Sequence, residues 1–126
     1  MSEIIFLDDS IIEAIYKDVV KSSGSNLYGF VNENFRSVPT TVENLFFYEN
    51  SRDILILATK YIFSIIQYHS FVDGNKRTAF AVMIEFLEEN GYELNYENDE
   101  MVNNVESIAA KNITFDDFVQ YLKSCL

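Results

Sequence analysis

The sequence predicts an all-α fold, a compact bundle of about six helices around one buried central helix, with a short flap or hairpin. Apolar residues recur at helical spacing along most of the chain, which contains only four Gly and one Pro. Ten of the 13 residues from Ile54 to Ile66 are apolar, on all sides of the helix that they would form. A helix of this kind is enclosed by others, so these residues are expected at the centre. The length of 126 residues predicts a single domain over residues 1–126.

Each element has its own signal. The expected helices cover residues 10–23, 41–48, 52–68, 75–90, 99–110 and 115–126. Ser10, Ser51 and Thr114 are the expected N-caps of the first, third and last helix. Gly24 and Gly91 stand where the first and fourth helices should end.

Two segments are expected outside the helices, and one helix has a predicted inward face. Residues 24–40 lack a helical period and should form an exposed loop or short hairpin, which we call the flap. Residues 92–96 should be extended. In the fifth helix the residues expected to face inward are Met101, Val102, Val105 and Ile108.

Charge and composition exclude several functions. Twenty acidic and nine basic residues give a net charge of −11, which repels phosphodiester backbones and anionic lipid. Binding to nucleic acid or to a membrane is therefore not expected. The only cysteine, Cys125, permits no intrachain disulfide and no cysteine-based zinc site. Without a basic N-terminal region or an apolar run of about 20 residues, the protein is expected in the cytoplasm.

One segment, HSFVDGNKRTA, carries the residue types of phosphate chemistry. It follows the central helix and begins with the only histidine, His69. The helix start after Gly74 offers unpaired N–H groups and a positive dipole end to an anion, where Lys76 and Arg77 add two cations. Asp73 is a carboxylate suited to Mg²⁺. Since His69 can accept a proton from a hydroxyl, the segment predicts phosphoryl or nucleotidyl transfer.

Taken singly, these residues also have simpler structural explanations. A histidine at a helix end is more often a cap or a packed side chain, and a Lys-Arg pair is more often solvated surface. Phe71 is most simply a plug that anchors the loop to the core. The Walker A pattern is absent, because Asn75 precedes Lys76 where that motif has Gly.

The whole segment resembles the Fic/Doc family signature, His-x-Phe-x-(Asp/Glu)-(Gly/Ala)-Asn-(Gly/Lys)-Arg, at all seven constrained positions. The order of elements is similar to the death-on-curing (Doc) branch over essentially the whole chain. The resemblance implies a Fic/Doc-like fold, ATP and Mg²⁺ as cofactors, and a flap that aligns a target protein by strand addition. It implies that His69 is the general base, that Asp73 holds Mg²⁺, and that nucleotide phosphates are held by Gly74, Asn75, Lys76 and Arg77.

Two positions depart from the branch of the family that transfers AMP. Lys76 stands where that branch has Gly, and Phe80, which cannot hold a phosphate, stands where it has a second Arg. The resemblance therefore favours a Doc-type kinase that transfers the γ-phosphate of ATP to a hydroxyl of a translation-associated protein. The alternatives are an AMP or other nucleotide-monophosphate transferase and a non-catalytic nucleotide-binding or interaction module.

Regulation is expected to come from another protein. Many Fic proteins carry an inhibitory helix with the pattern (Ser/Thr)-x-x-x-Glu-(Gly/Asn), which does not occur in this sequence. The resemblance then implies a toxin–antitoxin pair, in which a cognate antitoxin acts in trans. The expected partners are this antitoxin and a protein substrate.

Overall fold

The chain folds into six α-helices and one short 3₁₀ helix, and the computed structural model describes residues 3–126. In order these are α1 (Asp9–Ser23), η1 (Asn34–Ser37), α2 (Val38–Phe47), α3 (Ile54–Tyr68), α4 (Asn75–Glu89), α5 (Asn98–Ala109) and α6 (Phe115–Ser124). Within residues 3–126 there is no regular strand, which confirms the predicted all-α class. Nor does any helix in that range combine the length and hydropathy of a membrane span.

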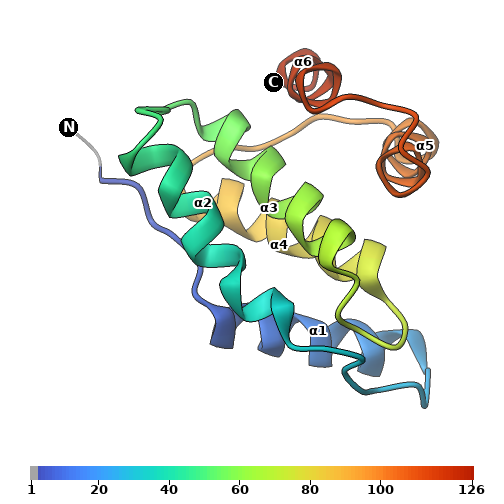
Figure 1. The fold of residues 1–126 in the computed structure, drawn as a ribbon. Coiled ribbons are helices and arrows are strands. Elements are labelled where there is room, and N and C mark those ends of the chain that lie inside the picture. Colours follow the sequence, from blue (N-terminus) through green and yellow to red (C-terminus); the bar gives the residue numbers. More distant parts are fainter. Residues whose placement is uncertain (1–2) are drawn as a thin grey trace.

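Helix α3 is the centre of the bundle, as its composition predicts. It packs against α2, α4, α5, α6 and η1, and nine of its 15 residues are buried. Figure 1 shows α3 and α4 side by side through the middle of the molecule, with α1 on one side of this pair and α5 and α6 on the other. The turn that joins α3 to α4 therefore lies at one end of the most enclosed helix pair.

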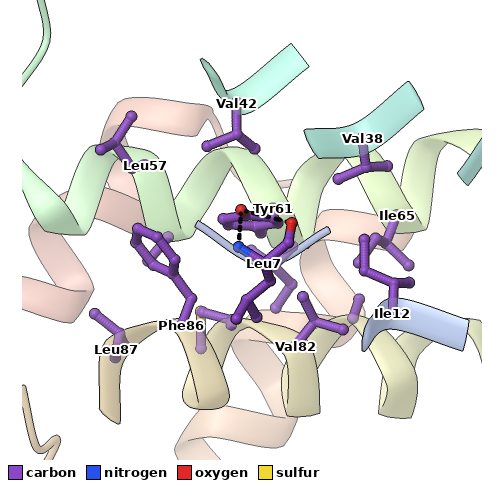
Figure 2. Close-up of a cluster of buried hydrophobic side chains, with 14 of the residues drawn as sticks. Leu7, Ile12, Val38, Val42, Leu57, Tyr61, Ile65, Val82, Phe86 and Leu87 are labelled. Carbon is purple, nitrogen blue, oxygen red and sulfur yellow. Dashed lines mark hydrogen bonds between the residues drawn. The ribbon is translucent and has the colours of Figure 1, made fainter. Parts of the chain in front are cut away.

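Tyr61 ties the segment before α1 to the core. Its hydroxyl accepts a hydrogen bond from the Leu7 N–H at 2.9 Å and donates one to the Leu7 carbonyl at 3.2 Å (Figure 2). Both residues are buried, and burial raises the pKa of Tyr61. Since a buried N–H or C=O without a partner is costly, this one hydroxyl allows Leu7 to be buried among the helices.

Three of the expected helix starts are wrong. The N-cap of α1 is Asp8, which accepts a hydrogen bond from the Ile11 N–H, and Ser10 donates to the Asp8 carboxylate. The N-cap of α3 is Asp53 instead of Ser51. In both cases a carboxylate replaces a hydroxyl, because its charge also complements the positive end of the helix dipole. Helix α2 begins at Val38 with a proline in its first turn, a favourable place for a residue without an N–H.

The flap is a loop without a hairpin, and it is shorter than residues 24–40. Its second half is helical, and its strand-like contact is a single antiparallel bridge from Phe30 to Phe71. Phe30 thus pairs with a segment that is distant in the sequence and not with a neighbouring strand.

The inward face predicted for α5 needs one correction. Met101, Val105 and Ile108 are buried, but Val102 is 57% exposed. Helix α5 packs mainly against α3 and α4, and its apolar stripe is wider than the surface that covers it.

Removal of the Tyr61 hydroxyl should destabilise the fold. We expect Tyr61→Phe to lower the free energy of unfolding by about 1–3 kcal/mol, because the buried N–H and C=O of Leu7 lose their partner. Urea denaturation followed by circular dichroism measures the change. Tyr48→Phe is the matched control, since Tyr48 is 84% exposed and its variant should stay within about 0.5 kcal/mol. Equal stability of the two variants would contradict the role given to Tyr61.

A candidate phosphate-binding active site at the turn between α3 and α4

The turn between α3 and α4 has left-handed backbone at both ends. His69 is the C-terminal cap of α3 with φ 48°, and its N–H donates to the Ile65 carbonyl at 3.3 Å. Gly74 is the N-terminal cap of α4 with φ 83°. A Cβ at position 74 would lie 3.6 Å from Val19, an ordinary contact, so glycine is required there by the backbone angle and not by lack of space. A left-handed non-glycine residue such as His69 is strained and typical of functional turns.

Phe71 holds the middle of the turn in the core. Its ring is fully buried and stacks on Tyr16 of α1 with centroids 3.8 Å apart and planes 15° apart. The rings of Phe30 and Phe35 lie 5.9 and 5.1 Å from it. Four elements of the chain thus meet at one aromatic cluster, which fixes the backbone on either side of Phe71.

Hydrogen bonds lay the flap against the turn. The N–H of Val31 donates to the Ser70 carbonyl at 2.8 Å, and the N–H of Val72 donates to the Gly29 carbonyl at 2.9 Å. The Ser70 hydroxyl donates to the Asn32 side chain at 2.6 Å and accepts from the Phe35 N–H. Flap and turn therefore form one unit around His69.

The start of α4 is open to an anion. Helices α1, α3, α5 and α6 each have a side chain that accepts a hydrogen bond from their first turn, whereas Gly74 offers none. The N–H groups of residues 75–77 precede the first helical bond, from Thr78 to the Gly74 carbonyl at 2.9 Å. This end of α4 also has no acidic residue in its first turn. An external anion can take the place of the missing cap.

Six of the seven predicted site residues surround one cavity of about 530 Å³. They are His69, Asp73, Gly74, Asn75, Lys76 and Arg77, and only Phe71 is absent because it lies buried beneath the turn. Helix α5 supplies the facing wall through Glu106 and Ala109. The cavity thus joins a histidine, two carboxylates, two cations and a helix N-terminus.

The two cations of the cavity differ in their partners. The Lys76 ammonium lies 2.8 and 2.9 Å from the two carboxylate oxygens of Glu106. Within residues 3–126, Arg77 has no carboxylate within 4.0 Å, whereas Arg36 is paired with three. In an acidic chain, an unpaired arginine beside a helix N-terminus is a site prepared for an anion.

The donor set fits Mg²⁺ only together with a phosphate. No group of three or more His, Cys, Asp or Glu side chains placed to hold a metal occurs within residues 3–126. Asp73 is exposed on the cavity wall, next to the open start of α4. Since Mg²⁺ typically takes one or two carboxylates plus phosphate oxygens and water, Asp73 suits it only when phosphates complete the coordination.

A second, apolar cavity of about 240 Å³ adjoins the first and was not predicted from the sequence. The two cavities share Lys76, Arg77 and Glu106. The apolar walls are Phe80, Tyr96, Met101, Val102 and Val105. The exposure of Val102 has its explanation here, because this side chain lines a hollow. The helical period of α5 indicates an apolar face, but it cannot show that part of the face is uncovered.

Comparison with known proteins identifies a family over most of the chain. The model of the Fic/DOC family matches residues 1–87, which include the flap, the whole turn and most of α4. A comparison with curated proteins gives no match. Helix α5, which supplies Glu106 and most of the apolar cavity, lies outside the matched residues.

Neutralising Glu106 should tighten anion binding at the cavity. We expect Glu106→Gln to free Lys76 and remove a like charge, so that inorganic triphosphate binds more tightly, by up to about fivefold. Isothermal titration calorimetry at low salt measures the affinity. Glu100→Gln on the same helix is the control, because Glu100 is exposed and lines neither cavity. Equal affinity in both variants would show that Glu106 does not compete for Lys76.

Proposed function

The chain belongs to the Fic/DOC family of protein-modifying domains, and from this premise we propose that it transfers the γ-phosphate of ATP to a hydroxyl group of a target protein. The observation that carries the proposal is the arrangement of the two cavities. His69 lines only the polar cavity, whereas Phe80 and Tyr96 line only the apolar one. Lys76 and Arg77 lie between them and line both. A nucleotide with its base in the apolar cavity would run its phosphates past both cations and present the last phosphate to His69.

Each site residue has a role in this proposal. His69 accepts the proton of the target hydroxyl, whose oxygen bonds to the γ-phosphorus as the bond to the β–γ bridging oxygen breaks and ADP leaves. Arg77, Lys76 and the N–H groups after Gly74 bind the phosphates. Asp73 would hold Mg²⁺, which neutralises phosphate charge when bound.

Lys76 must exchange its partner for this binding. Its ion pair with Glu106 is 45% exposed on the lysine side and 57% on the glutamate side. Exposed pairs contribute about 0–1 kcal/mol, so a phosphate can displace the carboxylate at little cost. Lys76 would then bind a phosphate only after it leaves Glu106. Arg77 has no carboxylate partner to leave within residues 3–126.

The flap is the proposed docking place for the target. Gly29 and Val31 bond to the turn that carries His69, and Val72 of that turn lines the polar cavity. Val31 is 66% exposed and Val72 is 47% exposed, although both lie beside the cluster of Phe71. An extended segment of the target can add to this edge and bring its hydroxyl to His69.

Phe80 supports γ-phosphate transfer over AMP transfer. Its ring packs edge-on against Tyr96, with centroids 5.9 Å apart, in the wall of the apolar cavity. The ring itself offers a phosphate neither a cation nor a hydrogen bond, so Phe80 cannot do what an arginine at this position would do. AMP transfer stays the alternative. It would require the nucleotide to lie along a different path through the same cavities, with its α-phosphate at His69.

The biological setting is part of the proposal. We propose a Doc-type toxin that acts in the cytoplasm on a translation-associated protein and is neutralised by a cognate antitoxin. In support, the chain carries the catalytic groups without the family's inhibitory sequence pattern. Regulation by a second protein then follows.

Labelled ATP distinguishes the reactions. With Mg²⁺ and a cell extract that contains translation factors, we expect protein to be labelled by γ-³²P-ATP and not by α-³²P-ATP. His69→Ala should reduce transfer by about 100-fold or more, because it removes the base. Lys111→Ala is the matched control, since Lys111 is also left-handed, with φ 61°, and lies far from the turn in sequence. Label from the α position alone would indicate AMP transfer, and no label from either would favour a non-catalytic module.

Expression of the chain alone should stop growth. We expect His69→Ala to abolish this toxicity, and co-expression of a small protein from a flanking gene to neutralise it. Colony counts after induction measure both effects. Harmless expression of the chain, together with flanking genes that encode no small protein, would contradict the toxin–antitoxin proposal.

A further inference from the structure

The Asn75 side chain is held in one orientation by the backbone of Phe71. Its Oδ1 accepts from the Phe71 N–H at 3.0 Å, and its Nδ2 donates to the Phe71 carbonyl at 2.8 Å. A backbone N–H can only donate and a carbonyl can only accept, so a flipped carboxamide would lose both bonds. Asn75 is 9% exposed and Phe71 is fully buried, which prevents water from replacing these bonds.

The second N–H of this carboxamide points to His69. The distance from Asn75 Nδ2 to His69 Nδ1 is 3.0 Å. Because Nδ2 is a donor only, Nδ1 must accept and therefore carries no proton. A neutral imidazole has one N–H, which is then on Nε2.

This protonation state matters for a base. We propose that Asn75 is a positioning residue that holds His69 as the Nε2–H tautomer, so that Nε2 donates and accepts no proton until the Asn75 carboxamide is released. The Nδ1–H tautomer, which has its lone pair on Nε2, would set two donors against each other across 3.0 Å. The effect of this tautomer on the base role of His69 rests on the proposed function. The tautomer itself rests only on the geometry of the hydrogen bond between Asn75 and His69.

Release of Asn75 is coupled to the anion site. Asn75 is the first residue of α4, and its own N–H is among those that an anion would bind. It also lines the polar cavity with His69 and Arg77. The carboxamide keeps its two bonds to Phe71, whereas His69 is exposed. Binding of a triphosphate at this end of α4 is thus placed to separate the imidazole from the carboxamide and make His69 a base only when its substrate is present.

Nuclear magnetic resonance of the unliganded protein tests the tautomer directly. His69 is the only histidine, so a ¹⁵N-labelled sample shows a single imidazole. At about pH 8.5 we expect a protonated Nε2 and an unprotonated Nδ1. We also expect a scalar coupling across the hydrogen bond between Asn75 Nδ2 and His69 Nδ1. A protonated Nδ1, or the absence of this coupling, would overturn the proposal.

Asn75→Asp should reverse the tautomer. A carboxylate can only accept, so Nδ1 should become the protonated nitrogen. Asn104→Asp is the control, because Asn104 on α5 also donates to a carbonyl four residues earlier, at 2.8 Å, and its variant adds the same charge away from the cavity. The control should keep the wild-type tautomer. An Nε2–H tautomer in folded Asn75→Asp would overturn the proposal, and if that variant does not fold, the wild-type coupling decides.

Addition of Mg²⁺ and ATP separates this proposal from the proposed function. We expect the coupling between Asn75 and His69 to disappear as ATP saturates the protein. Its persistence in an ATP-bound protein that still transfers label would overturn the release of Asn75. If ATP neither binds nor transfers label, the proposed function fails, while the wild-type coupling still establishes the tautomer.

Discussion

The burial of Phe71 is the interaction on which the site depends. A loop that joins two helices is usually solvated, but here an aromatic ring from its middle stacks on Tyr16 and is fully buried. This burial fixes the Phe71 backbone, which in turn orients the Asn75 carboxamide and, through it, the imidazole of His69. Hydrophobic burial is not directional, yet it supplies here the rigid frame from which directional hydrogen bonds are made.

Electrostatics then distinguish this turn from the rest of an acidic protein. Four helices are capped by their own side chains, and most acidic groups lie on the surface, where they repel polyanions in general. At the start of α4 the cap is missing, Arg77 lacks a carboxylate within residues 3–126, and Lys76 has a partner from which it can be displaced. An acidic surface thus surrounds one local arrangement of groups suited to an anion, as the proposed function requires.

The two tasks of the proposed site, holding phosphates and moving a proton, meet in one residue. Asn75 lies at the end of the helix that would bind the phosphates and also contacts His69. The apolar cavity on the far side of Lys76 and Arg77 would give the proposed nucleotide a single direction. In the proposed function, the first two turns of α4 would therefore bind and orient the nucleotide, while Asn75 connects them to His69 at the end of α3.

The sequence alone determined the helical class, the central place of α3 and the segment that matches the family signature. These depend on local periodicity and on residue types at short spacing, which a sequence records directly. It could not choose between neighbouring caps such as Asp8 and Ser10, because both satisfy the local rule and only the folded helix shows which one accepts the bond. Only the tertiary structure decided that the flap pairs with Phe71, that Glu106 holds Lys76 and that α5 leaves an apolar hollow. The first two join residues 30 or more positions apart, and the third lies between α4 and α5. Such contacts arise from how the helices pack, which no local pattern encodes.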